Sequence, residues 1–583
     1  MKTKEEKLEL IKAAMGEIAC DSTFVNVRFV NVFTGEIYPA EVDVYKGYVI
    51  HVRKDEKGVL PSKEVIDARG LYMIPGYVDP HMHIESTMLI PENFARVSVP
   101  WGTTCINHDP HEIGNVLGID GIRFMIENGN KTCQRQYAMA SSCVPAVVNL
   151  ENAGASFTSK EISELLDLEN VTAVAEIMDF VGVIKGDKRM HDIIEAGLEK
   201  NAFLQGHCPG LAGAGLDAYA LSGIESDHET STPKEVVDRL RLGMHTDLKS
   251  SSLVDNFKEL VKAFDQVRYH DHISFCTDDV HVADLLKVGH MNHLVRQAIE
   301  YGVDPIDAIR MATINPAKEE RLTDIGAIAP GYHADFQLVE KLDGEQPVQV
   351  YIDGKLVAEN GEYLGEAYKN DETFENTVHT DWITSYEDLL LKTEEKESVK
   401  VNVVVPSDGG NIIRHVECEE LKVEDGCVSI EGREDLSYVC VINRHYLKNK
   451  TIGVIKGFGL KEGAIGCTIS HDSHNLVLVY KNAKDAFIAL KKLEEAGGGM
   501  ALVCDGEVRN ILPLPVAGLM SDKPADEVGR ELLAYQEVYY RMMEGNANLL
   551  SISLMSLTAL PGVIITDKGL ADGLSQTFIP VFA

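Results

Sequence analysis

A pair of histidines one residue apart is the first feature of this sequence that could do chemistry. The run Ile-Pro-Gly-Tyr-Val-Asp-Pro-His-Met-His-Ile-Glu-Ser over residues 74–86 leads an apolar strand into His81 and His83. Residues two apart on a strand point to the same side, so both imidazoles can reach one metal ion. An isolated His-x-His usually means nothing, and the prediction therefore depends on further ligands.

Four more ligand-type residues each follow a candidate strand: Glu176, His207, His228 and Asp278. Solvated loop positions would explain each one singly, but not why all of them fall at strand ends in the order that a barrel needs. Four histidines and two carboxylates suit two divalent ions that share a carboxylate, with zinc, manganese or iron(II) as candidates. Such ions lower the pKa of a shared water. Asp278, beside that water, could take its proton and pass it to a leaving group.

The elements that would position these side chains are predicted to form an (α/β)₈ barrel between residues 70 and 320. Its candidate strands end near Val78, Ile106, Met139, Ile177, Leu204, Glu225, His245 and Phe275. Short apolar runs that alternate with helical stretches at the spacing of a βα unit favour a parallel barrel over an open sheet.

The segments that flank the barrel have a different sequence pattern. Apolar and polar residues alternate with a period of two over residues 23–68, and the same alternation returns after residue 320. This pattern predicts one small β domain built from both flanks. Strand patterns and amphipathic helices near 484–496 and 525–543 predict a C-terminal α+β domain. The predicted divisions are 1–69 and 321–370 for the split β domain, 70–320 for the barrel, 371–397 for a linker and 398–583 for the C-terminal domain.

Composition excludes several classes of protein. The 55 Lys and Arg against 91 Asp and Glu give a net charge of −36, which argues against a nucleic-acid partner. No apolar run approaches the about 20 residues that cross a bilayer, and the charged N-terminus does not look like a signal peptide. Eleven cysteines without a C-x-x-C pair suit a reducing compartment. We expect a cytoplasmic protein that forms a homo-oligomer.

The order His-x-His, Glu, His, His, Asp on such a barrel resembles the amidohydrolase superfamily. Several motifs are more specific and look like the bacterial adenine deaminase family: Pro75–Ser86, Asp109–Ile113, Gly206–Gly210, Ser226–Glu229 and Ala312–Pro316. The likeness continues through Ser470–Asn475, Gly497–Gly499 and Thr566–Leu570, and so covers nearly the whole chain.

This resemblance implies a dinuclear centre, with manganese or iron(II) favoured over zinc. Its ligands would be His81, His83, Glu176, His207, His228 and Asp278, with Glu176 as the bridge and with Glu176 and Asp278 as the catalytic residues. It also implies hydrolytic attack at C6 of adenine, which gives hypoxanthine and ammonia, a small-molecule purine as the partner, and a role in purine salvage.

Further polar residues lie beside these ligands in the sequence. Asp109, His111 and Glu112 could face a bound base or a metal-binding histidine, or could simply cap a helix. Glu85, Ser86 and Asp227 are candidates to support the ligands. His471, Asp472 and His474 could reach over the barrel mouth, bind another ion or stabilise their own domain.

The chain also departs from the family pattern. Met178-Asp179-Phe180-Val181-Gly182-Val183 has aspartate and valine where the family has asparagine and proline, and His245 stands where an aliphatic residue is expected. These differences keep an N6-alkylated adenine or a related heterocycle open as substrate. Opening of a cyclic amide, removal of an acyl group and a non-catalytic role for the same fold also stay open. A compact zinc deaminase is excluded, since the sequence has no P-C-x-x-C.

Overall fold

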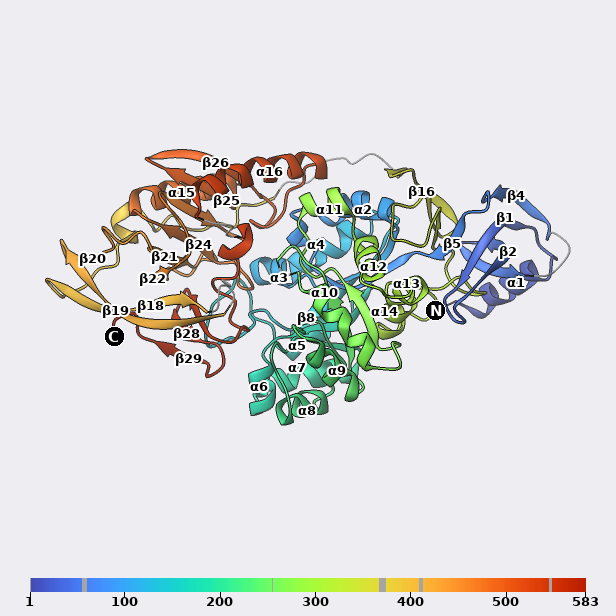
Figure 1. Cartoon of the computed structure of the whole chain (residues 1–583), viewed down its shortest axis with the longest axis horizontal. Coiled ribbons are helices and arrows are strands. Elements are labelled where there is room, and N and C mark those ends of the chain that lie inside the picture. Colours follow the sequence, from blue (N-terminus) through green and yellow to red (C-terminus); the bar gives the residue numbers. More distant parts are fainter. Residues whose placement is uncertain (1, 55–59, 254, 366–373, 408–412, 545–547) are drawn as a thin grey trace.

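Eight parallel strands form a barrel. This part of the chain lies between the N-terminal sheet and the C-terminal domain (Figure 1). The structure is a computed structural model that describes residues 2–54, 60–253, 255–365, 374–407, 413–544 and 548–583. The barrel strands are β6 (Tyr77–Met82), β7 (Thr103–His108), β8 (Arg135–Ser141), β9 (Val171–Ile177), β10 (Phe203–Gly206), β11 (Ser226–Asp227), β12 (His245–Lys249) and β13 (Ile273–Cys276). The predicted barrel class is confirmed.

Main-chain contacts close the barrel at two seams. Strands β6 to β10 form one sheet and β11 to β13 another. At the first seam Glu225 N donates to Leu204 O at 3.0 Å. At the second seam Asp278 N donates to His81 O and His83 N donates to Asp278 O, both at 3.1 Å. The second seam therefore brings three predicted ligands together through the backbone alone.

The seventh barrel strand differs from the prediction. The sequence predicts a strand that ends near His245, whereas β12 begins there and runs to Lys249. Thr246 and Asp247 are buried polar residues inside this strand, so its sequence lacks the apolar run that marks its neighbours. The correction matters because the carboxyl end of a barrel strand faces the active-site mouth, and that end is Lys249.

Helices cover the outside of the barrel. They are α2 (Pro91–Ser98), α3 (His111–Leu117), α4 (Ile119–Gly129), α5 (Ser159–Leu165), α6 (Phe180–Lys185), α7 (Lys188–Glu199), α8 (Ala214–Leu221), α9 (Pro233–Arg241), α10 (Phe257–Leu260), α11 (Val282–Val288), α12 (Met291–Glu300), α13 (Pro305–Met311) and α14 (Ile314–Glu319). Their sequences carry typical helix-start residues. Helix α9, for example, has a capping box between Thr232 and Glu235, and Pro233 lies in its first turn. Among the described residues, no helix is long and apolar enough to cross a membrane.

A nine-stranded sheet at one end of the molecule joins the two flanks of the barrel (Figure 1). Its strands are β1 (Cys20–Asn31), β2 (Glu36–Tyr45), β3 (Tyr48–Arg53), β4 (Ser62–Asp67), β5 (Tyr72–Pro75), β14 (Phe336–Val339), β15 (Gln349–Ile352), β16 (Lys355–Glu359) and β17 (Glu362–Tyr363), with helix α1 (Lys4–Ala14) nearby. The antiparallel pairing of β5 with β14 connects the segment before the barrel to the segment after it.

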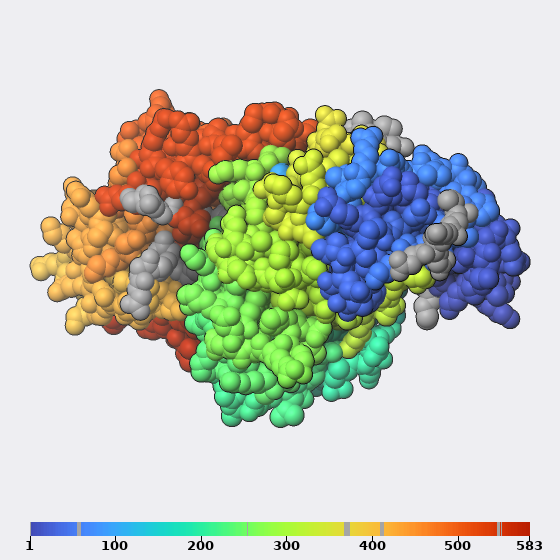
Figure 2. Space-filling view, turned by 45° about the vertical axis from the view of Figure 1, so that its right-hand side comes forward, coloured from blue at the N-terminus to red at the C-terminus, as the bar shows by residue number. Residues whose placement is uncertain are grey.

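The C-terminal part of the chain lies at the opposite end (Figures 1 and 2). Its strands are β18 (Ser398–Pro406), β19 (Arg414–Glu424), β20 (Cys427–Ser429), β21 (Leu436–Ile442), β22 (Lys450–Lys456), β23 (Ala464–Cys467), β24 (Leu476–Tyr480), β25 (Gly499–Cys504), β26 (Glu507–Pro513) and β27 to β29 (Val563–Thr566, Gly569–Asp572, Thr577–Ile579), with helices α15 (Ala483–Ala496) and α16 (Ala525–Met542). Residues 366–373, where the predicted linker begins, lie outside the described residues. Val378, Ile383 and Leu389, later in that segment, pack into the core of the C-terminal sheet.

Polar contacts tie the C-terminal part to the barrel. Asn475 Nδ2 donates to Asn152 O at 2.8 Å, and the Thr558 hydroxyl donates to Glu151. Asn93 Nδ2 donates to the main-chain oxygen of Lys523 at 2.8 Å. These contacts place loops of the C-terminal domain at the barrel mouth, where the predicted ligands lie.

Candidate metal centre

The His-x-His pair stands where β6 ends, and both rings are buried. Gln205 Nε2 donates to Pro80 O and Glu320, so Gln205 Oε1 accepts a hydrogen bond from His81 Nδ1 at 2.8 Å. His83 Nδ1 likewise donates to the main-chain oxygen of Asp109 at 3.0 Å. With the Nδ1 proton held outward, the Nε2 lone pair of each ring is free for a metal ion.

Glu176, at the end of β9, lies between two pairs of histidines. Its Oε1 is 3.5 Å from His81 Nε2 and 3.2 Å from His83 Nε2. Its Oε2 is 2.5 Å from His207 Nδ1 and 3.2 Å from His228 Nε2. Each carboxylate oxygen therefore faces a different pair, as a bridging ligand between two ions requires.

The electrostatics of Glu176 favour its charged form. Burial alone would raise the pKa of this carboxyl, but the charges of His228 and His207 outweigh burial and hold the pKa well below its ordinary value. Metal ions at the same place would act in the same direction.

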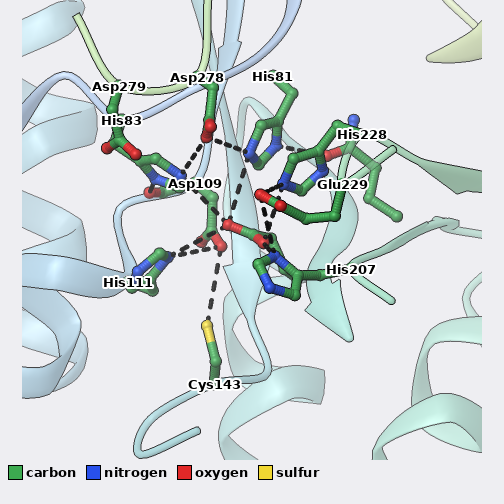
Figure 3. Close-up of polar contacts among 12 residues, drawn as sticks. His81, His83, Asp109, His111, Cys143, His207, His228, Glu229, Asp278 and Asp279 are labelled. Atoms are coloured by element: carbon green, nitrogen blue, oxygen red, sulfur yellow. Dashed lines mark hydrogen bonds and ion pairs between the residues drawn. The ribbon is translucent and has the colours of Figure 1, made fainter. Parts of the chain in front are cut away.

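Asp278 follows β13 and faces the His81–His83 side of the cluster (Figure 3). Its Oδ1 is 3.5 Å from His81 Nε2 and 3.4 Å from His83 Nε2, while its Oδ2 accepts a hydrogen bond from Lys249 Nζ at 2.8 Å. Burial would raise the pKa of Asp278, but Lys249 lowers it well below its ordinary value. The carboxylate is thus ionised, with one oxygen facing the histidines.

All six predicted ligands therefore meet at one buried place. His81, His83 and Asp278 lie close enough to hold one ion, as do His81, Glu176 and His228. The set of imidazole and carboxylate groups is typical of a divalent metal centre.

Comparisons with known proteins agree with this geometry. A model of the amidohydrolase family matches residues 72–357, and a model of the adenine deaminase C-terminal domain matches residues 411–577. Adenine deaminase 2 of Carboxydothermus hydrogenoformans is 37% identical over 577 residues, which cover 98% of this chain and 99% of the relative. The adenine deaminase of Methanothermobacter thermautotrophicus is 39% identical over 551 residues, which cover 94% and 98%. The chain belongs to the adenine deaminase family of amidohydrolases.

In this member of the adenine deaminase family, a cavity of about 350 Å³ opens onto the cluster. Leu554, Leu557, Leu560 and Pro561 of the C-terminal domain line the cavity together with five of the six predicted ligands: His83, Glu176, His207, His228 and Asp278. An apolar wall opposite polar groups is the usual composition of a small-molecule site.

The residues predicted to support the ligands lie at different positions around the cluster. Asp227 lies away from the cavity, where it accepts hydrogen bonds from Cys208 N at 3.1 Å and Arg239 Nε at 2.7 Å. It thereby fixes the loop that follows His207. Burial would raise the pKa of Asp227, but Arg239 lowers it to about 2.

Glu85, Ser86 and Glu112 lie next to the cluster, where Glu85 and Glu112 are buried and Ser86 is partly exposed. The Ser86 hydroxyl is 2.9 Å from Glu112 Oε1 and 2.5 Å from Asp279 Oδ1. Glu85 Oε1 accepts a hydrogen bond from Ile113 N at 3.3 Å. Burial, and then the charge of Glu112, raise the pKa of Glu85 to about 8. These residues do not line the cavity.

Of the three predicted residues from the C-terminal domain, two line the cavity and one does not. His471 and Asp472 line the cavity, as does His111 of the barrel. His474 does not: it is fully buried, with Nε2 3.5 Å from Glu112 Oε2. Burial holds the pKa of His474 well below its ordinary value.

Sequence reasoning missed Lys249 and Glu229. Lys249 Nζ contacts the carboxylates of both Asp278 and Glu229 and is almost fully buried. Burial would lower the pKa of Lys249, but Asp278 and Glu229 raise it well above its ordinary value. Correct placement of β12 would have found Lys249, because it would then stand at a strand end like the ligand-type residues.

Proposed function

We propose that this protein hydrolyses adenine to hypoxanthine and ammonia. Relatives named adenine deaminase that match over nearly their full length support this activity. The observation that carries the mechanism is the Glu176 carboxylate, whose two oxygens face two separate pairs of histidines.

Two divalent ions fit the donor set, with manganese or iron(II) as the first candidates and zinc as another. His81, His83 and Asp278 would hold one ion, His207 and His228 the other, and Glu176 both. The Nε2 atoms of His81 and His228 are buried and have no hydrogen-bond partner among the described residues, as expected of atoms reserved for metal. When bound, the ions lower the pKa of a shared water and polarise the group under attack.

Asp278 moves the proton in this reaction. It accepts a proton from the attacking water as the water oxygen bonds to C6 of adenine. It then delivers that proton to the exocyclic nitrogen, the C6–N6 bond breaks, and ammonia leaves. Lys249 fixes Oδ2 of Asp278 at 2.8 Å and so keeps Oδ1 towards His81 and His83.

The apolar wall holds the substrate. Leu554, Leu557 and Leu560 offer apolar contact to a purine ring, and burial of apolar area contributes about 25 cal/mol per Å². A base bound against this wall would share the cavity with Asp278, which also lines it.

The test is turnover of a substrate panel by the purified protein, followed by ultraviolet absorbance and ammonia release. We expect adenine to give hypoxanthine and one ammonia, activity to disappear after chelation, and manganese or iron(II) to restore it. Turnover of N6-methyladenine or of cyclic amides, without turnover of adenine, would overturn the substrate while leaving the metal centre intact.

A further inference from the structure

A second cluster of ligand-type side chains lies beside Glu176, where the C-terminal domain meets the barrel. His111 comes from the start of α3, and His471 and Asp472 from the loop between β23 and β24. One ligand atom of each lies within 4.8 Å of the others, and all three residues line the cavity. We propose that they form a further divalent-cation site, separate from the pair of ions at Glu176.

The spacing of the donor atoms fits one ion. His111 Nε2 is 3.3 Å from Asp472 Oδ1, and His471 Nδ1 is 3.8 Å from the same oxygen. Two ligands that each bind one ion at about 2.1 Å lie roughly 3.0 to 3.4 Å apart in octahedral or tetrahedral geometry. The distance from His111 falls within this range, and the distance from His471 exceeds it by 0.4 Å. The corresponding distances from Asp278 to His81 and His83 are 3.5 and 3.4 Å.

Hydrogen bonding prepares His111 for this role. Its Nδ1 donates to Asp109 Oδ2 at 3.0 Å, and the Asp109 carboxylate is itself held by the Ser141 hydroxyl at 2.5 Å. With the proton on Nδ1, the Nε2 lone pair of His111 faces an acceptor oxygen of Asp472. Two acceptors at 3.3 Å repel each other unless a metal ion lies between them or His111 carries a second proton on Nε2. A carboxylate behind a histidine is typical of metal sites and favours the ion.

The surroundings of this cluster are acidic. Asp109, Glu112 and Asp472 are all buried, and their ion pairs within the described part of the chain involve only histidines. Asp472 Oδ2 and His111 Nε2 are buried without a hydrogen-bond partner among the described residues. Buried charge of one sign is costly, and a divalent ion would neutralise it.

Two histidines and one carboxylate form a ligand set that leaves coordination positions open. Because these residues line the cavity, the open positions would face the same space as the substrate. The ion would also join the C-terminal domain to the barrel. This inference depends on the ligand geometry and does not require adenine to be the substrate.

The test is the number of manganese ions bound by metal-free protein after equilibrium dialysis, measured by elemental analysis. We expect three ions per wild-type chain and two per chain in the His471→Gln and Asp472→Asn variants. His415→Gln, which changes a half-exposed histidine of the same domain, is the matched control and should keep three. Far-ultraviolet circular dichroism verifies that each variant is folded.

Two ions per wild-type chain would overturn the proposal even if a variant failed to fold, and would favour a protonated His111 paired with Asp472. Three ions that persist in both folded variants would place the additional ion elsewhere and overturn it as well. A wrong assignment of the main centre gives a different result. If Glu176 does not bridge two ions, Glu176→Gln should bind as many manganese ions per chain as the wild type.

Discussion

Replacement of Asp278 by asparagine tests the proton transfer directly. In the wild type, Asp278 Oδ1 lies 3.5 Å from His81 Nε2 and 3.4 Å from His83 Nε2. The asparagine keeps a side-chain oxygen that can face these histidines, but this amide cannot accept a proton at neutral pH. Loss of a general acid–base group costs about a hundredfold or more in rate, which corresponds to about 2.7 kcal/mol in the activation free energy. We therefore expect kcat for adenine to fall at least a hundredfold while most of the metal stays bound.

The assay combines steady-state kinetics with elemental analysis of the same preparation. Asp217→Asn is the control, since Asp217 is an exposed residue of α8 outside the cavity, and it should leave kcat and metal content unchanged. A near-normal kcat in Asp278→Asn would remove Asp278 from the proton-transfer role. A low kcat that merely follows lost metal would show that Asp278 acts only as a ligand.

Three further outcomes follow from the contacts of single side chains. Lys249→Met should lower kcat roughly tenfold to a hundredfold, because a charge-assisted hydrogen bond to Asp278 contributes about 1.5 to 3 kcal/mol. Lys249→Arg keeps the charge and should lower kcat less. Equal rates in both variants would refute the positioning role of Lys249. Leu557→Ala should raise KM for adenine roughly tenfold with little change in kcat, because it removes apolar contact from the cavity wall. An unchanged KM would contradict a role for this wall in substrate binding. The pKa of Asp227 is about 2 when folded and 3.8 ordinarily, so its pairing with Arg239 stabilises the fold above pH 4 and is lost as pH falls towards 2. In urea unfolding, the stability difference between wild type and Asp227→Asn should shrink by about 1 kcal/mol between pH 6 and pH 3, and a constant difference would contradict this linkage.

The barrel could be predicted from the sequence because most of its strands are short, buried apolar runs separated by helices. β9 ends at Ile177, as expected, and most of the remaining strands end within a few residues of their predicted ends. β12 could not be placed correctly, because Thr246 and Asp247 are polar yet buried and interrupt the apolar pattern. Burial of such residues depends on partners far away in the chain, which local pattern does not reveal.

The six ligand-type residues could be found because each lies at the end of a strand or just after it, and the structure brings all of them together. Their roles as ligands stay a prediction until metal is observed. The wall formed by Leu554 and Leu557 was missed for a different reason. These residues reach the cavity only because the C-terminal domain docks on the barrel, a contact between segments separated by several hundred residues that leaves no periodic signal.

The central claim is that Glu176 bridges two ions, and anomalous diffraction from crystals of manganese-loaded protein tests it most directly. We predict two peaks on opposite sides of the Glu176 carboxylate, one beside His81, His83 and Asp278 and the other beside His207 and His228. A single peak there, or ions bound only at sites that Glu176 does not touch, would contradict the account.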